Sequence, residues 1–146
     1  MERDSHFQGL IDIYQAAPIN EFYRPVMFLE DRKSQIEIDV TDKMYHTFGF
    51  MHGSVYFKML DDAAYFASHT IEKEFFLLTV DFRIDFTRPF RSGRIIAHGI
   101  VQHVGKKDIL ARADVYDTKD RILATGVGRF TRSNMSLNDL KPYRKR

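Results

Sequence analysis

Hydrophobic and polar residues change their spacing several times along the chain, and each spacing predicts a different kind of element. Near the N-terminus the apolar positions follow the three- and four-residue spacing of an amphipathic helix. These positions are Phe7, Leu10, Ile11 and Tyr14. We expect Ser5 to cap this helix and Pro18 to lie just beyond its end,.

Strict alternation follows at residues 35–40, where Ile36, Ile38 and Val40 fall on one side, as in a half-buried strand,. Residues 55–68 then return to the helical period, with an apolar stripe wide enough for a largely buried helix,. The remaining polar positions of this helix form a narrow seam. They are Ser54, Lys58, Asp61, Asp62, Tyr65 and Ser68.

Period-two alternation dominates the rest of the chain and predicts four long strands joined by short turns. The strands are expected at residues 75–86, 94–104, 108–117 and 121–131. Because long twisted strands with one apolar face must cover something, the buried helix is their expected partner. The sequence therefore predicts an α+β fold, in which a long antiparallel sheet wraps around a central helix.

Composition narrows the class of protein. A chain of 146 residues with 44% hydrophobic residues is expected to form one domain with a packed core,. The absence of Cys excludes disulfides, thiolate zinc sites and a cysteine nucleophile,. We expect a single unit made of an N-terminal helical extension (1–33), a core (34–132) and a polar basic tail (133–146).

Charge and hydropathy give few signs of a macromolecular partner. The net charge is +2, and the concentrated basic stretch at 141–146 is typical of a solvated chain end rather than a nucleic-acid surface,. The N-terminus leads into no long apolar run, so we expect neither a signal peptide nor a membrane span,. The prediction is a cytoplasmic protein that binds no nucleic acid and no membrane.

Candidate chemistry gathers at the start of the central helix, in the stretch 46–54. A helix start that is flanked by glycine offers unpaired backbone N–H groups to a developing oxyanion. A carboxylate two turns further, Asp61, can activate water or attack directly, a pairing typical of acyl transfer,. Asp62 offers the same carboxylate about 100° further around the helix,. The histidines lack the spacing of a helical zinc site, so no metal and no cofactor are expected.

This order of elements and motifs resembles the hotdog fold, and within it the acyl-CoA thioesterases of the phenylacetate-degradation type. In that family a loop residue, usually Asn, precedes a His-Gly-Gly helix start by six positions, and an Asp follows that His by nine. His46, His52-Gly53-Ser54 and Asp61 occupy these positions here. His46 replaces the usual Asn and Ser54 the second Gly, and the resemblance covers residues 34–132.

The resemblance implies a homodimer or a dimer of dimers that hydrolyses acyl-CoA. An aromatic-rich interior, with Phe48, Phe50 and Phe57, suggests aryl or medium-chain acyl groups. Gly53 of one protomer would polarise the thioester carbonyl, and Asp61 of the other would act on it. His46 would orient the attacking water or contact the thioester, and Tyr65 would hydrogen-bond the Asp61 carboxylate. Further substrate contacts are expected from His52, Ser54, Tyr65 and Arg88. Coenzyme A phosphates could meet basic side chains at Arg88, Arg91, Arg94, Lys106 and Lys107,.

Two other functions remain open from the sequence. A hotdog dehydratase or hydratase would use His46 as base and Asp61 as acid, although the proline-rich turn usual in that branch is missing between them. A non-catalytic acyl-CoA binder would be consistent with His46 in place of Asn.

Overall fold

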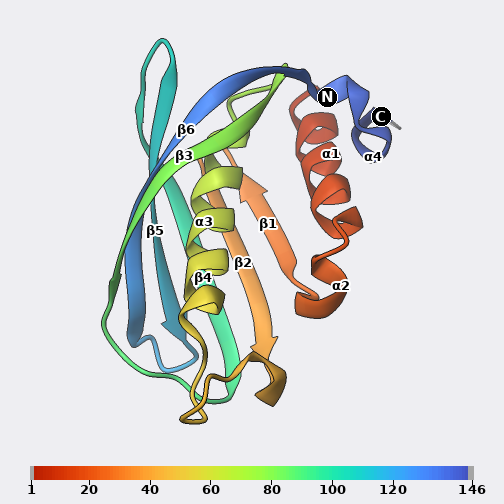
Figure 1. Ribbon diagram of the computed structural model, residues 1–146. Coiled ribbons are helices and arrows are strands. Elements are labelled where there is room, and N and C mark those ends of the chain that lie inside the picture. The colour runs from red at the N-terminus through yellow and green to blue at the C-terminus, as the bar shows by residue number, and fades with distance from the viewer. Residues whose placement is uncertain (1, 145–146) are drawn as a thin grey trace.

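A computed structural model describes residues 2–144, with side chains from residue 5 onward (Figure 1). The helices are α1 (Glu2–Ala16), α2 (Asn20–Tyr23), α3 (Gly53–His69) and α4 (Lys141–Arg144). The strands are β1 (Val26–Glu30), β2 (Lys33–Val40), β3 (Phe75–Phe86), β4 (Gly93–Val104), β5 (Asp108–Asp117) and β6 (Ile122–Ser136). Two short 3₁₀ turns lie at Asp42–Met44 and Leu137–Asp139.

The strands described here form one antiparallel sheet with the order β1-β2-β4-β5-β6-β3. The predicted meander is present in β4, β5 and β6. Strand β3 precedes β4 in the chain but pairs with β6, so it forms one outer edge of the sheet. Helix α3 lies along one face, and the sheet curves around it (Figure 1). This confirms the α+β hotdog fold with an additional N-terminal helix.

Helix α3 approaches β2 and β4 closely because small side chains meet there. A Cβ at Gly99 would collide with the Ala63 carbonyl, so only glycine permits this approach. Ser34 donates its hydroxyl hydrogen to the same carbonyl at 2.5 Å. These contacts fix the rotation of α3, and they leave its other side, which carries Asp61, toward β3 and α1.

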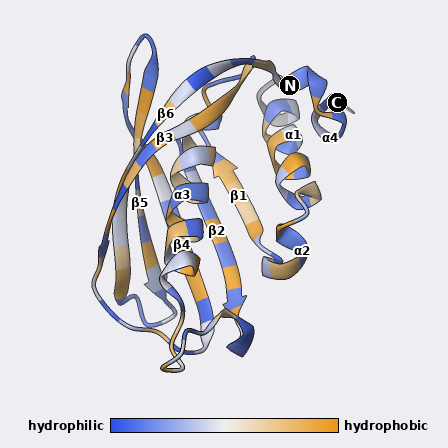
Figure 2. Cartoon of the chain, in the orientation of Figure 1, coloured by the Kyte–Doolittle hydropathy of each residue, from blue (hydrophilic) through white to orange (hydrophobic). Residues whose placement is uncertain are grey.

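Several boundaries differ from the sequence prediction. Strand β1 was not predicted, although it is largely apolar (Figure 2), because it is short and follows directly after Pro25. Helix α1 begins at Glu2, so Ser5 lies inside it and the predicted cap is wrong.

The segment expected to form a polar basic tail, residues 133–146, is folded as far as the structure describes it, to residue 144; residues 145 and 146 lie outside. Strand β6 continues to Ser136, and Leu137 is fully buried. Helix α4 then packs against α1 (Figure 1). The Tyr143 ring lies against Gly9. No helix among the described residues is long and apolar enough to span a membrane.

Candidate active site

The loop before α3 makes a tight turn that holds His46. The backbone N–H of His46 donates to the Phe50 carbonyl at 2.9 Å, and its carbonyl accepts from Gly49 at 3.0 Å. Gly49 has a φ of +80°, which glycine adopts without strain,. The His46 Nδ1 accepts the Phe48 N–H at 3.1 Å, so this nitrogen carries no proton and Nε2 remains for a further contact,.

His52 is the residue that caps α3. Its backbone is extended, with φ −64° and ψ 145°, and its Nδ1 accepts the N–H of Ser54 at 3.0 Å. The Ser54 hydroxyl lies 2.8 Å from the same nitrogen. Within the described chain the N–H of Gly53 has no hydrogen-bond acceptor. A free donor therefore stands at the positive end of the helix dipole.

Asp61 lies two turns further along α3, at a hollow of about 280 Å³ between α1, α3 and β3. We call this the Asp61 hollow. Thr79 of β3 donates its hydroxyl hydrogen to the Asp61 carboxylate at 3.0 Å. A β-bulge between Thr79 and Asp81 interrupts the strand at this point,. Burial raises the pKa of Asp61 to about 6, against the lowering effect of the Thr79 hydrogen bond.

Asp62 has a different environment. Lys58 forms an ion pair with its carboxylate at 2.6 Å, and Tyr14 of α1 donates a hydroxyl hydrogen to it at 2.7 Å. The carboxylate of Asp62 thus joins α1 to α3. Among the described residues, Asp61 has fewer hydrogen-bond and ion-pair partners than Asp62.

Tyr65 does not bond to Asp61 as the sequence analysis expected. Its hydroxyl donates to the Leu77 carbonyl at 2.8 Å, because β3 begins beside this turn of the helix. The Tyr65 ring still forms part of the wall of the Asp61 hollow. The hydrogen bond expected from Tyr65 is made by the Thr79 hydroxyl instead, and the sequence pattern gave no sign of Thr79. Only the fold brings a residue 18 positions away into contact with Asp61.

The candidate phosphate-binding residues lie in three different places. The loop that holds Arg88 lies at the start of α3, where the Arg88 carbonyl accepts the Tyr56 hydroxyl at 2.8 Å. Arg91 stacks on Phe50 in the same region, 4.8 Å from the ring centroid. Arg94 is instead paired with Glu37 and Asp39. The turn with Lys106 and Lys107 lies at the opposite end of the molecule (Figure 1). Of these five candidates, Arg88 and Arg91 are the two on the loop that contacts the start of α3 and the segment before it.

Gly53 and Asp61 of one chain cannot act on the same carbonyl group. They are eight positions apart on a continuous helix, which corresponds to roughly 12 Å along its axis,. Among the described residues no group of three or more His, Cys, Asp or Glu side chains could hold a metal ion.

Residues 48–124, more than half of the chain, match the family model of the Thioesterase superfamily. The chain belongs to this superfamily. A Saccharolobus solfataricus protein whose name assigns it provisionally to the esterases is 26% identical over 100 residues, which cover 68% of this chain and 67% of that protein. The 1,4-dihydroxy-2-naphthoyl-CoA hydrolase of Listeria monocytogenes is 22% identical over 99 residues, covering 67% of this chain and 80% of the hydrolase.

Among solved structures, this superfamily member is similar to the PaaI protein from the phenylacetic acid degradation operon of E. coli. The two structures superpose with a TM-score of 0.83 at 18% identity, covering 91% of this chain and 96% of PaaI. At this identity the similarity establishes the fold, and the residue roles must be argued from the site itself.

Proposed function

We propose that this protein is an acyl-CoA thioesterase, which hydrolyses an acyl-CoA thioester to the free acid and coenzyme A. The observation that carries the proposal is that α3 bears both a free amide, at Gly53, and a carboxylate with a raised pKa, at Asp61, which two copies of the chain could bring to one thioester. The Gly53 amide has no acceptor within the described chain. Asp61 is held by Thr79 and has a pKa raised by burial to about 6, so at neutral pH it is mostly an anion,.

In the proposed reaction, the thioester oxygen accepts the Gly53 N–H and the carbonyl carbon becomes electrophilic. The Asp61 carboxylate either removes a proton from a water that attacks this carbon, or attacks it directly and is regenerated by water. The C–S bond then breaks, and coenzyme A leaves as a thiolate that takes up a proton. A comparable oxyanion donor contributes about 2.7 to 4 kcal/mol to the lowering of the barrier in other enzymes.

The separation of Gly53 and Asp61 supports a site that two protomers share. Each site would take Gly53 from one chain and Asp61 from the other, as a homodimer allows. Strand β3 is an outer strand whose free edge can pair with a second copy,. Exposed apolar side chains gather near that edge. They are Phe57, Leu78, Val80 and Phe86, which are between 41% and 58% exposed.

The other predicted site residues take roles that follow from their positions. The Nε2 of His46 has no hydrogen-bond partner among the described residues and would contact the thioester or the attacking water. His52 and Ser54 stabilise the helix start, because the His52 ring accepts the backbone N–H of Ser54. The N–H of Gly53 then remains available to the substrate. Arg88, beside the same helix start, would contact a coenzyme A phosphate,. Tyr65 would contact the acyl group through its ring.

The direct test is hydrolysis of a panel of acyl-CoAs, followed by the release of free thiol. We expect turnover by the wild-type protein and a large loss in Asp61→Asn. Crotonyl-CoA hydration without thiol release would instead favour the hydratase. Binding without turnover of any substrate would favour an acyl-CoA binder. Either result would overturn the proposed hydrolysis.

The shared site has a separate test, in which two inactive variants are mixed. One variant carries Gly53→Pro, which removes the amide hydrogen, and the other carries Asp61→Asn. After random reassociation, half of the dimers are mixed and each contains one intact site, so about a quarter of the wild-type activity should return. If each chain held a complete site of its own, mixing would restore nothing.

A further inference from the structure

A second hollow adjoins the Asp61 hollow. It has a volume of about 360 Å³ and lies between α1, the second half of α3, β3 and the C-terminal segment. Its lining is almost entirely apolar or aromatic. Five of its nine lining residues also line the Asp61 hollow: Tyr14, Ala17, Tyr65, Phe66 and Phe76. The candidate carboxylate therefore stands at one end of an aromatic-walled space that ends at Leu140 and Pro142.

The walls of this space are fixed by polar contacts at both ends. On α1, the Tyr14 hydroxyl is held by Asp62 at 2.7 Å, and its ring packs edge-on against Phe66 with centroids 4.8 Å apart. At the other end His6 joins three segments. Its Nε2 lies 2.7 Å from the carbonyl oxygen of His69, and its Nδ1 lies 2.7 Å from the Tyr143 hydroxyl. Helix α1 and the C-terminal segment are thus tied to α3.

We propose that the two hollows together receive the acyl group of the substrate, and that α1 and the C-terminal segment set its maximum size. This inference rests on the proposed thioesterase function, because it takes Asp61 as the point where the thioester lies. Each volume is near the lower limit of about 300 Å³ for small-molecule pockets,. The site then prefers apolar acyl groups larger than acetyl and excludes long fatty chains.

Ala17 is the position where this proposal is most easily tested. It lies just after α1, is partly exposed, and lines both hollows. A leucine there adds three carbon atoms to the space between Asp61 and the C-terminal segment. Gln15, two positions earlier, is exposed and lines neither hollow, so Gln15→Leu is a matched control.

The measurement is the dissociation constant of S-alkyl-CoA thioethers, which cannot be hydrolysed, by isothermal titration calorimetry. Full burial of one methylene strengthens binding by about fourfold, and S-hexyl-CoA carries four more methylenes than S-ethyl-CoA. Even if these are only partly buried, S-hexyl-CoA should bind the wild-type protein at least about tenfold more tightly than S-ethyl-CoA. In Ala17→Leu we expect this difference to shrink to less than about threefold, while Gln15→Leu keeps it. Phe76→Ala, which opens the wall, should strengthen S-decyl-CoA binding relative to S-hexyl-CoA.

Equal affinities for the ethyl and hexyl ligands in the wild-type protein would overturn the inference. So would an equal loss for both ligands in Ala17→Leu, or a Phe76→Ala variant that gains no preference for the decyl ligand. Because binding is measured without turnover, the two proposals can fail separately. Chain-length-dependent binding together with no hydrolysis of any acyl-CoA would leave the acyl site standing and remove the thioesterase function.

Discussion

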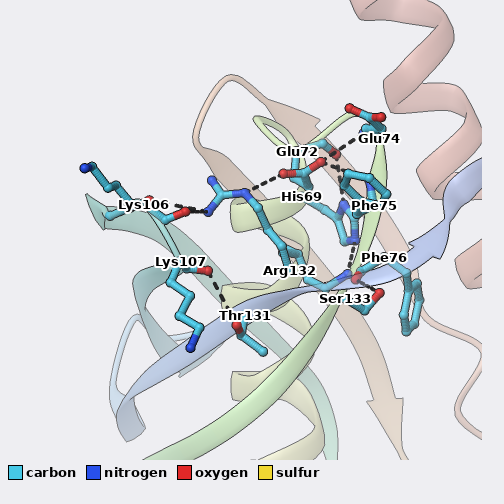
Figure 3. A network of polar contacts seen from close by, with 12 residues as sticks. His69, Glu72, Glu74, Phe75, Phe76, Lys106, Lys107, Thr131, Arg132 and Ser133 are labelled. Carbon is cyan, nitrogen blue, oxygen red and sulfur yellow. Dashed lines mark hydrogen bonds and ion pairs between the residues drawn. The ribbon is translucent and has the colours of Figure 1, made fainter.

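The start and the C-terminal end of α3 differ in how completely their polar groups are hydrogen-bonded. At the C-terminal end, His69 is fully buried; its Nδ1 lies 3.1 Å from the Glu72 carbonyl and its Nε2 accepts the Leu77 N–H at 3.1 Å (Figure 3). Glu72 accepts hydrogen bonds from Arg132 and from two backbone amides. At the start of the helix, the Gly53 amide has no acceptor within the described residues. Completeness of pairing therefore separates a structural cluster from a candidate site.

Perturbed pKa values alone would not separate them. Burial lowers the pKa of His69 to about 4 and raises the pKa of Asp61 to about 6, so the same cause favours the neutral form of both groups. The difference lies in what surrounds each group. Both ring nitrogens of His69 are hydrogen-bonded to backbone groups, which fixes its neutral form. Among the described residues, the Asp61 carboxylate accepts one hydrogen bond, from Thr79, and it faces a hollow. Of the two groups, Asp61 is the one beside a hollow that a ligand can enter.

The largest expected effect comes from removing the Asp61 carboxylate. Asp61→Asn keeps the shape of the side chain and its contact with Thr79. We expect kcat to fall by about 10² to 10⁴, the range in which general-base or nucleophilic groups contribute. Thiol release from the best acyl-CoA of the panel measures this fall. Full activity in the variant would remove Asp61 from the mechanism.

The same variant should unfold less readily, which a purely structural carboxylate would not show. The pKa of Asp61 is higher in the folded state than its ordinary value of 3.8, so its contribution to stability is lost as the pH rises through about 6,. At pH 8, Asp61→Asn should raise the free energy of unfolding by about 1 to 2 kcal/mol, allowing for residual exposure. Asp62→Asn, which weakens the ion pair with Lys58, should lower it instead.

The next largest effect should come from the Gly53 amide. Proline is tolerated at the first position of a helix, and the extended backbone of His52 suits a following proline,. Gly53→Pro therefore removes the N–H without breaking the helix, and kcat should fall by about 10² to 10³. Gly53→Ala keeps the N–H, and its methyl group would lie 3.6 Å from Phe86, an ordinary contact. Equal losses in the two variants would show that the amide hydrogen is not what matters.

The sequence predicts the long elements of this molecule well because burial imposes a clear period on them. Helix α3 and strands β2 to β5 begin and end within two residues of the predicted bounds, whereas β6 begins as predicted but continues to Ser136. The pattern fails in α4, where two of the four residues are charged and a single aromatic side chain, Tyr143, packs against α1. The candidates Asp61 and Gly53 follow from their spacing along one predicted helix and from the motif that they match. Thr79 does not, because a bulge and the pairing of β3 with β6 bring it to Asp61.

A smaller effect, on stability alone, is expected at the fully paired end of the helix. His69→Leu leaves the Leu77 N–H and the Glu72 carbonyl without their partners, so the free energy of unfolding at pH 7.5 should fall by about 2 to 4 kcal/mol,. Chemical denaturation measures this loss. Activity per folded molecule should stay within about twofold of the wild-type value. A large loss of activity in fully folded protein would contradict the division of α3 into two ends.

The pH dependence of stability gives His69 a second signature. The pKa of His69 is lowered to about 4 in the folded state, so below its ordinary value of 6.5 the unfolded chain binds a proton that the folded chain does not,. Stability is therefore lost as the pH falls from 6.5 toward 4. The part of this slope due to His69 should disappear in His69→Leu. An unchanged slope would show that folding does not lower the pKa of His69.

The smallest expected effect tests the contact that the sequence did not predict. The Thr79 hydroxyl stabilises the Asp61 carboxylate and lowers its pKa, so removing it should raise that pKa above about 6,. Thr79→Val keeps the shape of the side chain. If the carboxylate is the active form, the acid limb of the kcat profile should move to higher pH in this variant. Activity should fall roughly threefold at pH 6 and change little at pH 8. Thr79→Ser, which keeps the hydroxyl, should restore the wild-type limb, whereas an equal loss at both pH values would mean that Thr79 acts only through packing.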